Sequence, residues 1–359
     1  IIFDGRFIAD HFPGIGRYSY NLLQALLSIE PGLRIAMIYQ PGQRNTRHDL
    51  GMLIRQGVKL LVVDAAPLSP AAQLLIPQLL QRVTADVYHA PYYVRPYMRL
   101  PCHSVTTLYD LIPHHFPHYV SKRAALLFDV LNRLAARSSD ALMTLSEHAA
   151  REFAHAYSIP LTKLHVTPPA IDAQFMPQQA SAIDAFRRHM QLPQRYVLSL
   201  ASNKAHKNLS TLLHAWAQLH QAGQLRGTQL VIAGHWDTRY PHAGQLATRL
   251  GLGKAVHFLP NVAEPDLPCL YAGAELFVFP SLYEGFGLPP LEAMACYTPV
   301  ICGAHSSLPE VVGQAALCVD IGDANALAQA IRMLLEDLDQ RRAMAEAGLK
   351  QAALFYWAR

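Results

Sequence analysis

Short apolar runs rich in β-branched residues alternate with amphipathic stretches along the whole chain. The short runs have the length and composition of buried strands, whereas the longer stretches repeat their apolar residues at helical spacing. This alternation is typical of parallel α/β sheets, because parallel strands need a crossover connection, usually a helix. Strands are predicted at residues 1–3, 34–39, 58–63, 86–89, 104–108, 141–145 and 164–167, and again at 196–200, 229–233, 255–259, 276–279, 299–301 and 316–319.

The pattern also predicts where the chain divides. The strand–helix alternation pauses at a proline-bearing stretch from Thr167 to Gln179 and then restarts. A chain of 359 residues exceeds what one hydrophobic core usually organises. We therefore predict two Rossmann-like, doubly wound α/β domains, 1–172 and 173–345, that bind ligands at the carboxyl ends of their strands. Helices are predicted at 17–27, 121–136, 146–157, 207–221, 288–296, 324–335 and within 337–359.

Composition narrows the class of protein. Hydrophobic residues make up 51% and charged residues 16%, which is enough for two cores and leaves little room for long disorder. No apolar run is long enough to predict a spanning helix, and the opening residues have the pattern of a buried strand rather than a signal peptide. Five scattered cysteines without a C-x-x-C pair indicate reduced thiols. We expect a cytoplasmic protein, with peripheral contact at the inner face of the plasma membrane left open. The formal charge of +4 is too small to indicate nucleic-acid binding.

The segment from Phe279 to Ala293 carries the clearest chemical signal. An apolar strand ends there, a turn with Gly285, Phe286 and Gly287 follows, and a helix starting at Leu288 is pre-set by two prolines. Glycines let backbone N–H groups approach an anion, and the helix N-terminus adds partial positive charge. The segment therefore predicts a diphosphate site.

Two carboxylates flank that turn. Glu284 lies in the turn itself, where it can accept hydrogen bonds from sugar hydroxyls. Glu292 lies about one turn into the helix, where it can accept from a ribose diol. The alternative for Glu292 is a carboxylate that only complements the helix dipole.

Glu284 and Glu292 together resemble the E-x7-E signature of retaining glycosyltransferases of family 4. The resemblance implies a GT-B fold, two facing Rossmann-like domains with the nucleotide-sugar donor held mainly by the second, no cofactor and no obligatory metal. It also implies transfer of a hexose, mannose or glucose, from GDP-mannose or UDP-glucose to a glycan or lipid-linked acceptor, and a C-terminal helix over 346–359 that crosses back to the first domain and is shortened here. Further similar segments are 14–18, 105–113, 146–147, 203–208, 308–311 and 355–357.

A basic loop opens the second domain. Lys207 follows the first strand of that domain, where its ammonium group can reach donor phosphates and neutralise the leaving group. Asn203 and Lys204 belong to the same family-like loop and are assigned to the donor site with it. Many family members carry arginine next to the lysine, and here that position is His206. The alternative for Lys207 is an ordinary surface lysine.

The first domain contributes four candidate residues. Gly14 and Gly16 follow the first strand and precede a helix, so they either turn backbone N–H groups toward the donor or make an ordinary strand–helix turn with positive φ. Tyr109 stands where the family usually has a histidine that contacts the transferred sugar, and it is assigned to the donor site because its hydroxyl can still donate one hydrogen bond. Its high reference pKa makes it a poor proton shuttle. Asp110 either orients the acceptor, as a catalytic residue, or caps the following turn.

Two other segments of the first domain, one rich in histidine and one rich in tyrosine and arginine, are weaker candidates for binding sites. His114, His115 and His118 lie in a proline-bounded segment expected to be a loop, and we expect no metal there. Tyr92, Tyr93, Arg95, Tyr97, Met98 and Arg99 form an aromatic-basic patch that either contacts a lipid headgroup or the acceptor, or is an ordinary exposed loop. The rival functions are a catalytically silent nucleotide-sugar-binding subunit and a GT-B epimerase or hydrolase of nucleotide sugars.

Overall fold

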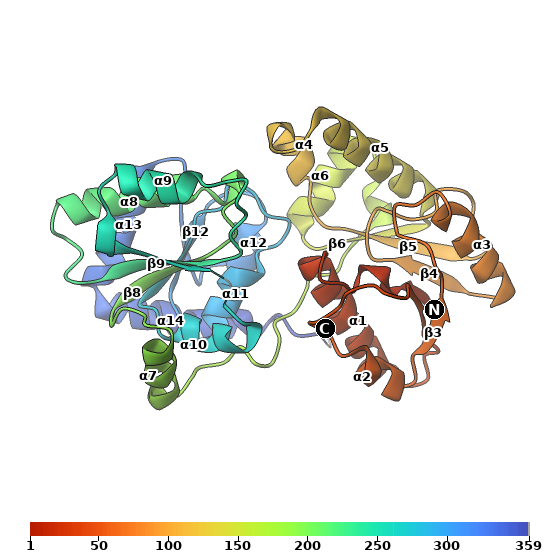
Figure 1. Ribbon diagram of the computed structural model, residues 1–359, viewed down its shortest axis with the longest axis horizontal. Coiled ribbons are helices and arrows are strands. Elements are labelled where there is room, and N and C mark those ends of the chain that lie inside the picture. The colour runs from red at the N-terminus through yellow and green to blue at the C-terminus, as the bar shows by residue number, and fades with distance from the viewer. Residues whose placement is uncertain (261, 358–359) are drawn as a thin grey trace. The chain divides into compact units, whose positions relative to one another are not determined.

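A computed structural model describes residues 1–260 and 262–357. The chain forms two compact units (Figure 1), one of residues 1–169 together with Trp357 and one of Ala170–Tyr356. The division therefore falls between Pro169 and Ala170, three residues before the boundary predicted from the sequence, which was after residue 172.

The first unit is built on a parallel sheet of seven strands with the order β3-β2-β1-β4-β5-β6-β7. Strand order reverses between β1 and β4, which makes that point the topological switch of the sheet. The strands are β1 (Ile2–Asp4), β2 (Ala36–Tyr39), β3 (Lys59–Val62), β4 (Val87–Ala90), β5 (His103–Leu108), β6 (Ala141–Thr144) and β7 (Leu164–Val166).

Helices connect these strands, and their starts follow from local sequence. Pro13 occupies the first turn of α1, where a missing N–H costs nothing. The hydroxyls of Ser121 and Ser146 accept hydrogen bonds from the N–H groups of Ala124 and Ala149 and so cap α5 and α6. The helices are α1 (Pro13–Ile29), α2 (Leu50–Arg55), α3 (Ala72–Arg82), α4 (Ile112–His115), α5 (Lys122–Ser138) and α6 (Glu147–Tyr157).

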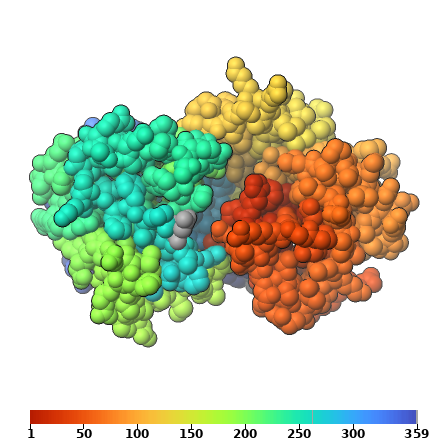
Figure 2. All heavy atoms as spheres, viewed as in Figure 1, coloured from red at the N-terminus to blue at the C-terminus, as the bar shows by residue number. Residues whose placement is uncertain are grey.

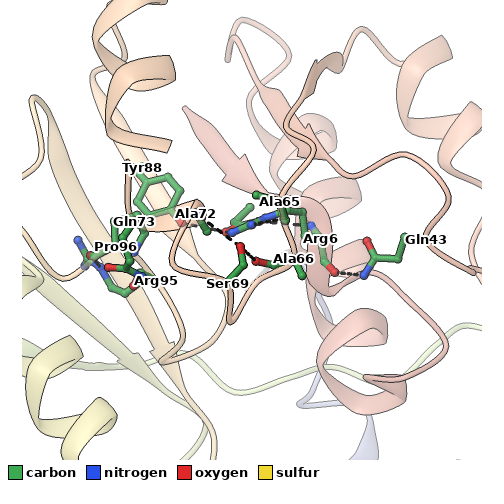
Figure 3. Close-up of polar contacts among 11 residues, drawn as sticks. Arg6, Gln43, Ala65, Ala66, Ser69, Ala72, Gln73, Tyr88, Arg95 and Pro96 are labelled. Carbon is green, nitrogen blue, oxygen red and sulfur yellow. Dashed lines mark hydrogen bonds and ion pairs between the residues drawn. The ribbon is translucent and has the colours of Figure 1, made fainter. Parts of the chain in front are cut away.

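A buried ion pair lies at the end of β1 (Figure 3). The Arg6 guanidinium donates to both carboxylate oxygens of Asp4 at 2.8 and 2.7 Å, and both side chains are fully buried. The Tyr88 hydroxyl donates to Asp4 at 2.9 Å, and Arg6 also donates to the carbonyl of Ala65 at 2.8 Å. Because the charges are paired and further hydrogen-bonded, the network fixes the chain that leads into α1.

The second unit holds a parallel sheet of six strands with the order β10-β9-β8-β11-β12-β13. This order reverses between β8 and β11, as it does in dinucleotide-binding folds. Its strands are β8 (Tyr196–Leu200), β9 (Gln229–Gly234), β10 (Val256–Pro260), β11 (Leu276–Phe279), β12 (Val300–Gly303) and β13 (Leu317–Val319).

The core of the second unit surrounds Trp216, which is fully buried and donates through its indole N–H to the carbonyl of Ala255 at 3.0 Å. The helices of this unit are α7 (Ala180–His189), α8 (Leu209–Gln221), α9 (His242–Arg249), α10 (Leu267–Ala272), α11 (Leu288–Ala295), α12 (Leu308–Val312), α13 (Ala324–Glu336) and α14 (Leu338–Ala352).

The C-terminal segment differs from the separate helix expected over 346–359. Residues 346–352 are the end of α14, which packs against α11 inside the second unit. Phe355 also belongs to that unit, with its ring centre 5.7 Å from that of Phe286. Trp357 groups with the first unit, where its ring centre lies 5.7 Å from that of Tyr18. Residues 358 and 359 lie outside the described part of the chain.

Every predicted strand is present, and each predicted helix overlaps an observed one. The loop expected at His114–His118 is wrong, because α4 and a 3-10 turn, η2 (Pro117–Tyr119), occupy it. No helix among residues 1–260 and 262–357 is long and apolar enough to cross a membrane.

Candidate donor site

The candidate site in the second unit lies at its switch point, where the loops after β8 and β11 emerge side by side. The loop after β8 ends in a 3-10 turn, η4 (Ala205–Lys207), and the loop after β11 holds residues 280–287. The N–H of Leu282 donates to the carbonyl of His206 at 2.8 Å and ties the two loops together. Ligands of such sheets bind at this edge.

Lys207 and Glu284 meet there. The Lys207 Nζ lies 2.5 Å from the Glu284 Oε1, and the side chains are 17% and 13% exposed. The same ammonium lies 5.4 Å from the centre of the Phe279 ring, within cation–π range. Residues 77 positions apart in sequence are therefore held in one partly desolvated ion pair, where electrostatic interactions are stronger than in water.

Two serines after β12 fix the backbone of the glycine turn. The Ser306 hydroxyl accepts a hydrogen bond from the N–H of Glu284 at 3.2 Å. The Ser307 hydroxyl donates to the carbonyls of Glu284 at 2.9 Å and Phe286 at 2.6 Å. Neither serine was predicted from the sequence. Their position directly before the family-like segment 308–311 could have identified them. They position Glu284 through its main chain.

Gly287 begins α11 in a conformation that other residues rarely adopt. Its φ is +114°, and a Cβ built there would lie 2.6 Å from the Leu308 Cδ2. Pro289 and Pro290 carry no N–H, so the donors at the start of the helix come from Gly287, Leu288 and later residues. Gly285 and the buried Phe286 complete the turn. The glycine turn and the helix start are thus both present, and anion binding there stays a prediction.

Glu292 is buried in α11, where its Oε2 accepts a hydrogen bond from the Tyr271 hydroxyl at 2.9 Å. A carboxylate has further acceptor positions, so this bond leaves the predicted role toward a ribose chemically open. Tyr271 was not identified from the sequence.

The residues of the loop after β8 have different surroundings. The Asn203 amide donates to the carbonyls of Asp237 and Tyr240 at 2.7 Å each and accepts from the Asp237 N–H at 2.8 Å, so it braces the loop after β9. Lys204 is exposed. Burial lowers the pKa of His206 to about 3, and the nearby charges of Lys207 and Lys204 act in the same direction. His206 is therefore neutral at pH 7 and does not replace the arginine that many family members have there.

In the first unit, Gly14 and Gly16 do not precede the helix as expected, because α1 begins at Pro13 and includes both. Neither is among the glycines with positive φ. A Cβ at Gly16 would come within 3.2 Å of the Phe7 carbonyl oxygen, so this glycine permits close packing, whereas Gly14 faces open space. Gly14 lies in the first turn of α1.

Tyr109 and Asp110 follow β5. The Tyr109 ring contacts those of Tyr18 and Tyr92 edge-on, and burial raises its pKa well above the usual value. Asp110 accepts a hydrogen bond from the N–H of Ile112 at 3.0 Å, which is the turn-capping geometry. The capping role is therefore present, and contact of Asp110 with an acceptor stays a prediction.

The histidine segment and the aromatic-basic segment are both part of the packed first unit. His114 and His115 pair with Asp129 and Glu152 at 2.9 Å each. Within the described ranges, no group of three or more His, Cys, Asp or Glu side chains is placed to hold a metal ion. Among the aromatic and basic residues of that segment only Arg95 is buried, where it donates to Thr106 and Ser139. Tyr92, Tyr93 and Tyr97 are half-buried, and Met98 and Arg99 are exposed.

Comparison with known proteins shows the family of this chain. A model described as Glycosyltransferase Family 4 matches residues 13–175, and one described as Glycosyl transferases group 1 matches residues 183–351. O-antigen chain mannosyltransferase B of Escherichia coli is 30% identical over 369 residues, covering 99% of this chain and 96% of that protein. The chain belongs to glycosyltransferase family 4. The serotype-specific mannosyltransferase WbdA of E. coli is also 30% identical, over 73% of this chain, and the chain spans about a third (33%) of WbdA.

Solved structures agree on the fold of this family 4 chain. Sucrose-phosphate synthase from Thermosynechococcus elongatus has a TM-score of 0.79 at 21% identity, covering 99% of this chain and 94% of that one. The lipopolysaccharide glycosyltransferase WaaG has a TM-score of 0.71 at 19% identity, over 98% and 95%. Anabaena HepE, solved with UDP and glucose, has a TM-score of 0.73 at 20% identity, over 99% and 94%. The two units are those of the GT-B fold.

Proposed function

We propose that this glycosyltransferase moves a hexose, mannose in the first instance, from a nucleotide-diphosphate sugar to a glycan or lipid-linked acceptor with retention of configuration. The observation that carries the proposal is the Lys207–Glu284 ion pair at the switch point of the second sheet. Mannose is favoured over glucose because the relatives at 30% identity are named mannosyltransferases. The names of these relatives and of WaaG also favour an acceptor of O-antigen or lipopolysaccharide type.

In this proposal the donor diphosphate lies against the glycine turn and the start of α11. The ammonium of Lys207 is paired with Glu284. A bound phosphate offers Lys207 a second anionic partner, and Glu284 then accepts hydrogen bonds from hydroxyls of the sugar. The ribose is held by Glu292, and Asn203 and Lys204 belong to the same donor site.

Retention is proposed to occur by attack on the same face from which the phosphate leaves. Negative charge grows on the leaving diphosphate as the glycosidic bond breaks, and Lys207 and the N-terminus of α11 stabilise that charge. A donor phosphate oxygen takes the proton of the acceptor hydroxyl. Tyr109 is not assigned a proton-transfer role, because its raised pKa keeps it protonated at neutral pH. Lys207 and the helix N-terminus take the place that a divalent metal has in other transferases.

The experiment that tests this proposal incubates the protein with GDP-mannose or UDP-glucose and a soluble aryl mannoside. An α-linked glycoside identified by NMR supports the proposal, and a β-linked product from these α-configured donors overturns retention. Free sugar as the product identifies a hydrolase, and an isomerised nucleotide sugar identifies an epimerase. Nucleotide-sugar binding by calorimetry without transfer, hydrolysis or isomerisation identifies a silent binding subunit.

A further inference from the structure

Two cysteines face each other across the last two strands of the second sheet. Cys302 in β12 and Cys318 in β13 are direct partners in the parallel ladder, and their sulfur atoms lie 3.7 Å apart. Neighbouring strands run about 4.8 Å apart, within the range of about 4.4–6.8 Å that separates the Cα atoms of disulfide-linked cysteines. Both residues are free thiols. The backbone therefore holds two thiols at a separation from which a disulfide bond can form.

The two thiols differ in exposure and in acidity. β13 is the edge strand, and Cys318 is half-buried there, whereas Cys302 is fully buried. A hydrogen bond from the Cys302 thiol lowers the pKa of Cys318 below its ordinary value, and the same contact together with burial raises the pKa of Cys302. Burial also raises the pKa of Cys102, Cys269 and Cys296. Because the thiolate is the reactive form, Cys318 is the expected attacking thiol of this chain.

The strands that carry these thiols also hold the candidate donor site. The two serines that follow β12 hydrogen-bond the main chain of Glu284. Asn208, next to Lys207, donates through its side-chain amide to the carbonyl of Ile321 at 2.8 Å, two residues after the end of β13. Each member of the Lys207–Glu284 ion pair is therefore connected to one of the two strands by a hydrogen bond of its own loop.

Close packing leaves little room for these strands to move independently. A Cβ built at Gly303 would lie 2.9 Å from the Ile321 Cδ1 and 3.1 Å from the carbonyl oxygen of Ser281, in the loop after β11. In the view of Figure 2 the blue part of the chain, which includes β12 and β13, lies mostly behind green and teal residues of the same unit. Packed interiors transmit displacement, so a movement of β12 that brings the two sulfurs into bonding contact is passed on to the loop after β11.

We propose that small disulfides, such as oxidised glutathione, convert Cys302 and Cys318 into a reversible intramolecular disulfide that displaces the loop holding Glu284. The Cys318 thiolate attacks one sulfur of the reagent, forms a mixed disulfide with it and releases one thiolate. Cys302 then attacks the Cys318 Sγ and releases the second thiolate, and the two cysteine protons pass to the solvent or to the released thiolates. The cysteine sulfurs lose two electrons, which reduce the reagent to two thiols.

Peptide mapping of the full chain tests the bond itself. The protein is reduced, freed of reductant and incubated with oxidised glutathione at about pH 8, where thiolate is present. Mass spectrometry without reduction should find Cys302 linked to Cys318, and dithiothreitol should restore both thiols. A chain that keeps both thiols, stops at the mixed disulfide or links a different pair overturns the proposal.

Single substitutions separate the two steps. Cys302→Ala should accumulate the mixed disulfide at Cys318, and Cys318→Ala should leave Cys302 reduced, because its thiol is buried and its pKa is raised. The matched controls lie in the same unit: Cys296→Ala for a buried thiol and Cys269→Ala for a half-buried one. Both controls should form the bond at the wild-type rate. A Cys318→Ala protein in which Cys302 reacts as fast as in wild type overturns the order of attack.

Hydrogen exchange measures the effect on the donor site. The backbone amides of residues 282–287 should exchange at least about tenfold faster in oxidised than in reduced wild type, and glutathione should not change them in either pair variant. Transfer should slow by at least about tenfold on oxidation and recover with dithiothreitol. Since exchange is measured without donor or acceptor, it tests the inference even if the proposed transfer function fails. A disulfide that forms while these amides keep their exchange rates overturns the displacement of the loop.

Discussion

The hydroxyl of Tyr271 donates a 2.9 Å hydrogen bond to the carboxylate of Glu292, and both side chains are buried. The bond joins α10 to α11 and orients the carboxylate assigned to the ribose. Tyr271→Phe removes one donor from a buried carboxylate, so we expect a loss of about 1–3 kcal/mol in the free energy of unfolding and weaker binding of nucleoside diphosphate. Denaturation and calorimetry measure the two effects separately.

Tyr196→Phe is the matched control for that variant. It removes an equally buried hydroxyl of the same unit, which donates to the carbonyl of Leu270 at 2.7 Å. Both variants should lose stability, but only Tyr271→Phe should lose affinity for nucleotide. Equal affinities in the two variants would argue against a ribose contact at Glu292.

Lys207→Ala should lower turnover by about 10²-fold or more while weakening donor binding less, because the ammonium acts on charge that develops in the transition state. Steady-state kinetics with donor and acceptor varied in turn give both quantities. Lys254→Ala, at an exposed lysine in the same unit, is the control. A turnover within about threefold of wild type would reduce Lys207 to a structural partner of Glu284.

Gly287→Ala should destabilise the second unit by several kcal/mol and abolish activity. The new methyl meets Leu308 at 2.6 Å, and φ of +114° is strained for any residue with a Cβ. Gly223→Ala separates the two causes, since Gly223 has φ of +67° with nothing within 4 Å. Thermal denaturation should show a loss of only about 1 kcal/mol there. Equal losses at both sites would show that the contact with Leu308 is relieved at no cost.

Stability should fall as the pH drops from 7 to 5. Burial lowers the pKa of His89 to about 4 and that of His206 to about 3, against 6.5 for an ordinary histidine. The unfolded chain therefore binds more protons below pH 6.5, and each histidine removes about 1–2 kcal/mol by pH 5. Denaturation curves at both pH values should show a smaller drop in His89→Gln and His206→Gln than in wild type. A stability that rises on acidification would contradict the assignment of both histidines as neutral.

Transfer should continue in EDTA, because the proposed leaving-group stabilisation comes from Lys207 and the N-terminus of α11. Product formation with and without chelator, at equal ionic strength, measures this. Activity that EDTA abolishes and a divalent cation restores would show that the site uses a metal after all.

Much of the fold was predictable because strands in a parallel sheet are short, apolar and bounded by turns. The strand predicted at 196–200 is β8 itself, and the helix predicted at 288–296 is α11 to within one residue. The short helices α2, α4, α9, α10 and α12 were missed, since four to eight residues give too few helical repeats to recognise. The longer α7 and α3, which has Pro77 inside it, were missed as well. Gly14 and Gly16 were placed before α1 because the helix-start signal of Pro13 was not used.

The sequence by itself determined which residues could carry the chemistry: Glu284, Lys207 and Glu292 stand in short motifs whose local geometry follows from glycine and proline. The tertiary structure decided what holds them. Ser306 and Ser307 reach Glu284 across more than 20 residues of chain, a contact that no local pattern encodes. The same holds for α5, where Phe128 and Leu126 are both apolar. Only packing against the rest of the unit determines that one is buried and the other left facing solvent, because hydrophobicity favours burial without specifying the partner.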